Sequence, residues 1–424
     1  NAQQPHTATR HTDMGMTNPQ TDIHHIVASM DTGIDDALAL ALLLAQPNVR
    51  LHGVSASYGN VLEQPAARNT RAVLSLLGRS DIPVFDGARH PSWAPYFIAD
   101  AGCAQFHGSD GLGDVSTGDG DNADFTPTTP GETLASDANG LVTLTAPQIR
   151  NLTECGTAIS VGGYQVGEKH ADLPTMPELT IPSGSAHTPT PEKLEFPQES
   201  CSQATAGARM IVDAARAFGP DLTILVTGPL TDIDTALTLD PEAVRQARIV
   251  FMGGTLTQEG NCYDLVCETN MIQDPEAADR VLRSGADVTM VGLDVTHRCL
   301  LGSSDITPWN AAHTEASRFL TAIAEFSIRA NAASEPIFAA GMPLHDPLAA
   351  AVALDATLVG TLDLPMCVET RSGDGTGVRG RTIGNPQGFI DASLCPTHVA
   401  VGVDRERFLA RFTGDIANLL TSLR

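Results

Sequence analysis

Residues 26–45 read Ile26-Val-Ala-Ser-Met-Asp31-Thr-Gly-Ile-Asp35-Asp36-Ala-Leu-Ala-Leu-Ala-Leu-Leu-Leu-Ala45. The apolar run before Asp31 favours a strand, and the Ala/Leu segment has high helix propensity, so the stretch predicts strand, tight loop and helix. The three acids repel one another, and a helix N-terminus compensates only about 0.3–1 kcal/mol per charge. A calcium or magnesium ion would compensate far more. An N-cap aspartate beside solvated acids is the alternative explanation.

Strands and helices alternate along most of the remaining chain. Apolar runs take turns with segments of helical spacing, which predicts a parallel sheet with right-handed crossovers. We therefore expect an α/β fold, a single large domain whose mostly parallel central sheet is flanked by helices in a Rossmann-like manner. The expected strands are 49–57, 82–85, 222–226, 248–252, 287–291 and runs within 364–403, and the expected helices are 66–77, 204–218, 275–284, 311–333, a segment ending at Leu354, and 405–423.

Two segments interrupt this alternation. Residues 1–22 are rich in Gln, Thr, His and Pro without periodicity, which predicts a disordered arm ahead of a domain spanning 23–424. Residues 115–200 are rich in Gly, Thr, Pro and Ser, and a stretch of that length without elements indicates a loop-rich surface insertion. Residues 88–113 are expected to be loop-like.

The charge balance restricts the partners. The chain of 424 residues carries 50 acids against 25 Lys and Arg, a formal net charge of −25, and its aromatic content is 4%. An acidic surface repels polyanions, so we expect no nucleic-acid polymer and no anionic membrane as a partner. No run approaches the roughly 20 apolar residues of a membrane span. A neutral small molecule or a cation is the expected ligand.

The cysteines and the start of the chain favour secretion. The eight cysteines form an even set without a CxxC pair, which disfavours zinc or thioredoxin chemistry, and Asn151-Leu-Thr153 is an N-glycosylation sequon. The chain starts at Asn1, as a mature product would after removal of a signal peptide. We therefore expect an extracellular glycoprotein with some disulfides, whose pairing the sequence leaves open. Eight buried free thiols are the alternative.

Polar residues follow the expected strands. Asp31 ends the first strand, and Tyr58-Gly59-Asn60 follows the second. Ligands of open α/β sheets bind at the carboxyl ends of the strands. Asp31 and Asn60 are therefore expected to lie at a functional site.

Seven short motifs occur in order at loop positions, and together they resemble one family. The motifs are Asp31-Thr-Gly-Ile-Asp35-Asp36-Ala-Leu-Ala-Leu, Tyr58-Gly-Asn60, His107-Gly-Ser-Asp-Gly-Leu, Thr227-Gly-Pro-Leu-Thr, Met252-Gly-Gly, Glu268-Thr-Asn270 and His345-Asp346-Pro-Leu-Ala. The family that they resemble is that of the inosine–uridine-type nucleoside hydrolases, and the match covers roughly residues 26–113 and 204–424. The chain departs from the family pattern at Ser29 and Thr32, where the family has Asp and Pro.

The resemblance implies a calcium-dependent ribonucleoside hydrolase that releases ribose and a free base. Cleavage of the N-ribosidic bond passes through an oxocarbenium-like sugar and needs an activated water and help for the departing base. By resemblance, calcium is bound by Asp31, Asp36, the main-chain carbonyl of Thr227 and Asp346. Asp31 would be the general base for the water.

Substrate contacts are also implied by the resemblance. His345 is placed to protonate or hydrogen-bond the leaving base, because imidazole titrates in the required range. Trp93 and Phe338 favour stacking on a purine over pyrimidine selectivity, although either could be a plain core residue. A homodimer or homotetramer is the family's usual assembly. The remaining implied contacts are Asp35 with the 2′-hydroxyl, Asn60 beside Asp31, Asn261, Glu268 and Asn270 with the 3′- and 5′-hydroxyls, and His107 at the border of the base.

Other functions remain open at this point. The segment around Asp31 also resembles the aspartate segment of subtilisin-like proteases, but the chain has no Gly-Thr-Ser-x-Ala segment for the nucleophile. An aspartic protease would need a second Asp-Thr/Ser-Gly, which the chain lacks. A calcium-dependent nucleoside- or ribose-binding protein without catalysis is the alternative of a different class. A helix-entry role for His345, a surface position for His107 and solvation of Glu268 are the bland alternatives for those side chains.

Overall fold

The computed structural model describes residues 23–99, 101–115, 204–262, 265–334, 336–371, 378–384 and 395–423. The predicted arm 1–22, the sequon at Asn151 and the predicted insertion beyond Val115 lie outside these ranges. Among the described residues, none of the helices combines the length and the apolar character that a membrane span requires.

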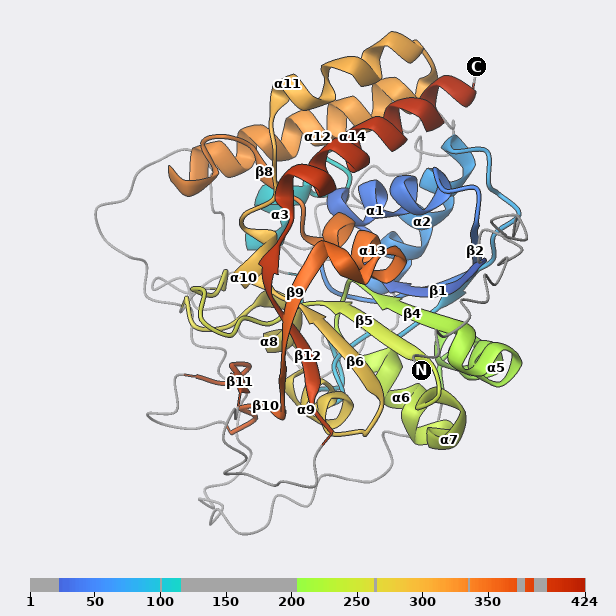
Figure 1. The fold of residues 1–424 in the computed structure, drawn as a ribbon, viewed down its shortest axis with the longest axis vertical. Coiled ribbons are helices and arrows are strands. Elements are labelled where there is room, and N and C mark those ends of the chain that lie inside the picture. Colours follow the sequence, from blue (N-terminus) through green and yellow to red (C-terminus); the bar gives the residue numbers. More distant parts are fainter. Residues whose placement is uncertain are drawn as a thin grey trace, which may run out of the picture.

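An eight-stranded sheet forms the centre of the molecule (Figure 1). Its strand order is β3-β2-β1-β4-β5-β6-β12-β9, and every neighbouring pair is parallel except β12 with β9. The predicted α/β fold with a mostly parallel sheet is confirmed. The strands are β1 (His24–Met30), β2 (Val49–Ala56), β3 (Val84–Asp86), β4 (Leu222–Val226), β5 (Arg248–Met252), β6 (Asp287–Val291), β9 (Val359–Leu364) and β12 (Thr397–Val403).

Strand β1 supplies side chains to both faces of the sheet because successive residues of a strand point to opposite sides. Ile26, Ala28 and Met30 belong to one hydrophobic cluster, and Val27 belongs to the other. Its neighbours are β2 on one side and β4 on the other. β1 therefore lies inside the sheet, and the loop that follows it is fixed from both sides.

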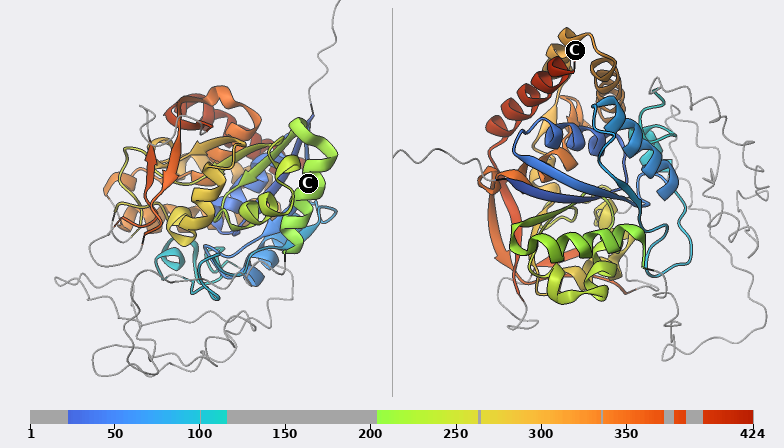
Figure 2. Two further views of the ribbon diagram at one scale, coloured as in Figure 1. Left: turned by 90° about the horizontal axis from the view of Figure 1, so that it is seen from below. Right: turned by 90° about the vertical axis from the view of Figure 1, so that its right-hand side faces the viewer.

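Helices cover both faces of the sheet (Figure 2). One cluster packs α1 (Ile34–Leu44), α12 (Glu315–Ser334), α13 (His345–Leu354) and α14 (Arg405–Ser422) over one face. The second cluster packs α5 (Ala206–Phe218), α6 (Thr231–Leu239), α7 (Pro241–Val244) and α9 (Pro275–Leu282) over the other. The remaining helices are α2 (Glu63–Leu76), α3 (Ala101–His107), α8 (Thr269–Gln273), α10 (Leu293–Thr296) and α11 (Ser303–Ile306), with short 3-10 turns at Gly219–Asp221, Thr307–Ala312, Pro336–Phe338 and Ala356–Leu358.

The structure corrects several expected boundaries. Residues 88–113 are not loop throughout, since α3 occupies Ala101–His107. The expected helix over 311–333 starts later, at Glu315, after a 3-10 turn. The sequence reading missed α6, α8 and α10, which are too short for a clear helical period. Two small antiparallel strand pairs complete the described structure. They are β7 (Leu300–Leu301) with β8 (Met342–Pro343) and β10 (Met366–Val368) with β11 (Thr382–Gly384).

Candidate active site

Four aspartates meet at the carboxyl end of β1. Asp31 follows β1 directly, Asp35 and Asp36 lie in the first turn of α1, and Asp346 lies in the first turn of α13, which packs against α1. Carboxylate oxygens of Asp35, Asp36 and Asp346 lie within 4.8 Å of one another. All four side chains are buried, at most 7% exposed. The two helix N-termini thus bring together acids that lie more than three hundred residues apart in the chain.

Hydrogen bonds orient two of these carboxylates. The Gly33 N–H and the Thr227 hydroxyl donate to Asp36 Oδ2 and Oδ1 at 2.8 and 2.6 Å. The Asn60 N–H donates to Asp31 Oδ2 at 2.6 Å. Gly33 also has no room for a side chain, because a Cβ there would meet the rings and amides of His107 and Asn60. The loop after β1 is therefore held in a single close-packed conformation.

Hydrogen bonds compensate only part of the negative charge of the four aspartates. Asp31 Oδ1 and Asp35 Oδ1 have no hydrogen-bond partner among the described residues. Burial raises the pKa of Asp35 and of Asp36 to about 6 and raises the pKa of Asp31 and of Asp346 well above the usual range. Neighbouring carboxylates raise the pKa of Asp31, Asp36 and Asp346 further, whereas a hydrogen bond with Asp346 lowers that of Asp35. Buried like charges of this kind are relieved either by taking up protons or by a cation. Four carboxylates and carbonyl oxygens form the all-oxygen donor set that suits calcium.

The three carboxylates whose oxygens lie within 4.8 Å of one another are not the three carboxylates that were predicted as calcium ligands. This group contains Asp35, which was predicted as a substrate contact, beside Asp36 and Asp346. Asp31, a predicted ligand, is outside that group, although the charge of Asp36 raises its pKa. The carbonyl of Thr227, another predicted ligand, accepts a hydrogen bond from Asn270 Nδ2 at 2.7 Å.

Glu268 and Asn270 lie next to the acid cluster. Glu268 is the N-cap of α8, and its carboxylate accepts hydrogen bonds from the backbone of Asn270, Met271 and Gly254. Both side chains are buried, at 2% and 6% exposure, so the alternative of a solvated Glu268 is excluded. Burial raises the pKa of Glu268 to about 7. Asn261 is exposed instead, and its Oδ1 accepts from Thr269.

Three histidines line the same region from separate segments. The Ile34 N–H donates to His107 Nδ1 at 3.1 Å, and that nitrogen lies 3.8 Å from Asp35 Oδ1. His345 Nδ1 is 2.8 Å from the Thr296 hydroxyl. The ring of His297 lies edge-on to the rings of His345 and Phe338, at centroid distances of 5.6 and 5.1 Å. Burial lowers the pKa of all three imidazoles, to about 4 for His107 and His297.

Trp93 and Phe338 have different surroundings. Trp93 is 46% exposed, its indole N–H donates to the Gln273 carbonyl, and the Arg379 guanidinium lies 5.2 Å from its ring centre. Gln273 in turn reaches the carbonyl of Gly59 at 3.4 Å, which connects the Trp93 loop with the loop after β2. Phe338 is buried beside His297.

Sequence reasoning missed Thr296 and His297. Both follow β6 in the segment Gly292-Leu-Asp-Val-Thr-His297, and Thr296 contacts the predicted catalytic His345. Their position directly after a parallel strand could have indicated them, because ligands bind at the carboxyl ends of such strands.

Comparison with known proteins agrees with the geometry. The model of the family described as inosine-uridine preferring nucleoside hydrolase matches residues 26–410. The curated pyrimidine-specific ribonucleoside hydrolase RihA of Enterobacter sp. (strain 638) is 29% identical over 385 residues, which cover 91% of this chain and 95% of that protein.

Solved structures show the same fold. The purine-preferring ribonucleoside hydrolase from Gardnerella vaginalis is 32% identical with a TM-score of 0.68, over 94% of this chain and 99% of that chain. An inosine-guanosine nucleoside hydrolase, 21% identical with a TM-score of 0.63 over 93% of this chain and 99% of that one, shows the likeness in fold alone. The matched length, the shared sheet and the buried acids at its carboxyl edge have one explanation: the chain belongs to the inosine-uridine preferring nucleoside hydrolase family of enzymes.

Proposed function

We propose that this enzyme hydrolyses the N-glycosidic bond of ribonucleosides, purine nucleosides in preference to pyrimidine nucleosides, to ribose and a free base. The observation that carries the proposal is the buried acid cluster, in which Asp31 Oδ1 and Asp35 Oδ1 have no hydrogen-bond partner among the described residues. An ionised carboxylate with such an oxygen is stabilised when a cation or a ligand hydroxyl meets it. The family and the fold supply the reaction class.

The residues fit a calcium ion. Asp31, Asp36, Asp346 and the Thr227 carbonyl are the proposed ligands, and Asp35 lies close enough to Asp36 and Asp346 to join them. A calcium ion held by these residues would orient the ribose hydroxyls and the attacking water and would lower the pKa of that water.

Asp31 is the proposed general base. The Asn60 N–H occupies Oδ2, so Oδ1 is the oxygen that remains to accept a proton from the water.

His345 is the proposed donor to the leaving base. Its Nδ1 lies against the Thr296 hydroxyl, which leaves Nε2 for the base. The lowered pKa keeps the imidazole neutral at pH 7. When the Thr296 hydroxyl donates to Nδ1, the single ring proton resides on Nε2 and stabilises negative charge on the departing base by a hydrogen bond.

The ribose and base contacts complete the proposal. Asp35, Asn60, Asn270, Glu268 and Asn261 are the proposed hydroxyl contacts. The backbone donors to Glu268 fix both of its oxygens, so they meet a sugar hydroxyl without reorganisation.

The purine preference rests on the aromatic groups near the site. Trp93 keeps an exposed indole, and Phe338 lies beside His297. The relatives divide between a pyrimidine-specific and a purine-preferring enzyme. The larger ring system of a purine gains more from stacking, which favours purine nucleosides here.

Extracellular location, glycosylation at Asn151, disulfides and a homo-oligomeric assembly stay predictions. The structure contains no disulfide between cysteines of the described ranges, and Cys155 and Cys201 lie outside them. Mass spectrometry of the protein secreted into culture medium, with and without reduction and deglycosylation, tests the first three, and light scattering tests the assembly.

The first experiment measures reducing sugar released from inosine, adenosine, guanosine, uridine and cytidine, with and without a chelator. We expect chelator-sensitive release, faster from the purine nucleosides. Equal or faster release from uridine and cytidine would refute the purine preference. Absence of release from all five, with calcium confirmed bound, would favour a nucleoside-binding protein.

A variant then tests the leaving-group step. His345→Ala should slow release from inosine about 10²-fold. It should slow an aryl riboside with an activated leaving group far less, because that leaving group needs no hydrogen bond. Equal losses on both substrates would rule out His345 as the donor.

A further inference from the structure

Asp31 is packed between two loops, since a Cβ on Gly59 or on Gly228 would meet its carboxylate. Its carboxylate accepts one hydrogen bond among the described residues, from the Asn60 N–H at 2.6 Å. A Cβ on Gly59 would overlap the same carboxylate, so the backbone of residues 58–60 lies directly against it. A shift of the 58–60 loop therefore moves the hydrogen-bond donor of the proposed general base.

The loop is anchored by the side chain of Tyr58. The phenol is fully buried, its ring lies 4.6 Å from the ring of Phe97, and its hydroxyl is 2.9 Å from the Thr231 hydroxyl at the start of α6. Thr231 Oγ1 is also 2.8 Å from Asp274 Oδ2. A chain of three buried groups thus connects residue 58 with the N-cap of α9.

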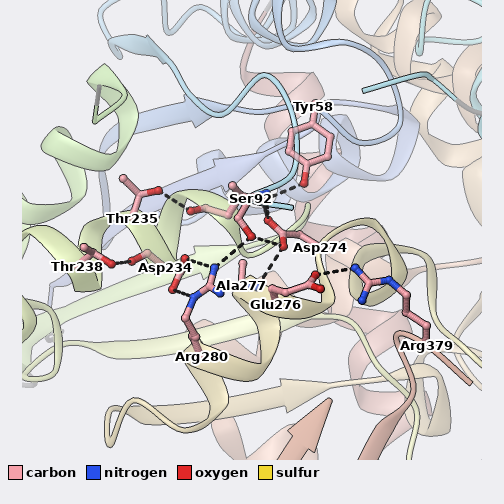
Figure 3. Close-up of polar contacts among 11 residues, drawn as sticks. Tyr58, Ser92, Asp234, Thr235, Thr238, Asp274, Glu276, Ala277, Arg280 and Arg379 are labelled. Carbon is pink, nitrogen blue, oxygen red and sulfur yellow. Dashed lines mark hydrogen bonds and ion pairs between the residues drawn. The ribbon is translucent and has the colours of Figure 1, made fainter. Parts of the chain in front are cut away.

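The donors in this chain point in one direction. The Asp274 carboxylate is an acceptor, and it receives the Ser92 N–H and hydroxyl, the Ala277 N–H and the Thr231 hydroxyl (Figure 3). A threonine hydroxyl has one proton. Since Thr231 donates that proton to Asp274, Tyr58 must donate its own proton to Thr231.

Two arginines support the hydrogen-bond chain at its Asp274 end. Arg280 contacts both Asp234 and Ser92, and Arg379 pairs with Glu276 in the first turn of α9 (Figure 3). Asp274 itself is completely buried. Bulk water has no access to replace a missing partner there, so removal of one hydroxyl leaves its neighbours unpaired.

We propose that Tyr58, Thr231 and Asp274 are positioning residues for the hydrolytic reaction, which hold the Asn60 N–H on the Asp31 carboxylate through a one-way chain of hydrogen bonds. This inference rests on the proposed function of Asp31. It predicts that loss of the chain affects the chemical step more than substrate binding, because the chain acts on the general base.

The test compares Tyr58→Phe, Thr231→Val, the double variant and the conservative Thr231→Ser with Thr238→Val as a matched control. Thr238 lies on the same helix, and its hydroxyl donates to the Asp234 carbonyl one helical turn earlier, outside the chain. The kcat and KM of each variant are measured on the nucleoside that the wild type hydrolyses fastest, and thermal unfolding verifies the fold.

We expect Tyr58→Phe and Thr231→Val each to lower kcat about ten-fold with KM within two-fold of wild type. The double variant should lose no more than either single variant, because both break the same link. Thr231→Ser should recover most of the activity, and Thr238→Val should leave it unchanged. A kcat within two-fold of wild type for Tyr58→Phe, or multiplicative losses in the double variant, would overturn the inference.

A crystal structure of Tyr58→Phe separates this inference from the proposed function. We expect a longer Asn60 N to Asp31 Oδ2 distance than in the wild type, irrespective of the reaction. An unchanged distance would overturn the positioning role. Absence of nucleoside hydrolysis by the wild type, with a lengthened distance in the variant, would contradict only the proposed function.

Discussion

Asp31 and Asp274 are buried to the same degree, at 1% and 0% exposure, and their surroundings are opposite. Among the described residues, Asp274 accepts four hydrogen bonds, two from Ser92 and one each from Thr231 and Ala277. From the same part of the chain Asp31 accepts one, from Asn60, and it lies among three other aspartates. A buried carboxylate whose oxygens accept hydrogen bonds from the protein stabilises the fold. A buried carboxylate with an unpartnered oxygen among like charges is instead available to bind a cation or a substrate.

The largest effect should follow from Asp31→Ala. Loss of a general base typically costs 10²–10⁴-fold, and we expect kcat to fall about 10³-fold while the fold stays intact. Reducing-sugar release and circular dichroism measure the two properties. Asp213→Ala is the control, because Asp213 is an exposed aspartate of α5. A wild-type rate for Asp31→Ala would remove Asp31 from the mechanism.

Removal of calcium should come next. A ligand that binds only the folded state stabilises it by about 2.7 kcal/mol at a concentration of 100 Kd. A chelator should therefore lower the melting temperature of the wild type and abolish activity, and added calcium should restore both. The same treatment of a variant with Asp36→Asn and Asp346→Asn should change the melting temperature little. An unchanged wild-type melting temperature would contradict the calcium site.

Two isosteric substitutions in the metal-free protein should change the free energy of unfolding in opposite directions, one for each kind of carboxylate. Asp35→Asn removes one like charge and should raise the free energy of unfolding by about 1–2 kcal/mol at pH 7.5, because the pKa of Asp35 is raised to about 6 by burial. Asp274→Asn removes acceptors from satisfied donors and should lower it by about 1–3 kcal/mol. Denaturant unfolding in chelator measures both. Changes of the same sign would break the comparison.

The smallest expected effect is the pH dependence of the stability gain from Asp35→Asn. The folded pKa of Asp35 is about 6 against 3.8 for the unfolded chain, so in the metal-free protein its contribution to stability is fully present below about pH 4 and is lost as the pH rises through about 6. The stability gain of Asp35→Asn in chelator should therefore vanish near pH 4 and reach its full size above pH 7. A gain independent of pH would exclude the titration of Asp35 as its cause.

Much of the fold could be predicted from the sequence because local patterns determine it. The strands 222–226, 248–252 and 287–291 have the predicted bounds, since each is a short apolar run between polar turns. The helix α3 was missed because seven residues with an internal glycine carry no helical period.

The candidate site was only partly predictable. Asp36 and Asp346, two of the carboxylates implied by the family resemblance, are brought together with Asp35 in place of Asp31, and the Asn60 N–H donates to Asp31. The environment of Trp93, the contact of Thr296 with His345 and the place of His297 depend on segments far apart in the chain. No local pattern reports such contacts.

The sequence by itself determined the order of the main strands and the longer helices, the acids at the start of α1 and the family, because propensity, periodicity and motifs are properties of neighbouring residues. The tertiary structure alone decided the strand order in the sheet, the meeting of Asp346 with Asp35 and Asp36, and which buried carboxylates are satisfied. The physical reason is that desolvation and hydrogen-bond partners depend on what packs around a group. Asp31 and Asp274 are the same residue type in the sequence, and only their packed surroundings distinguish them.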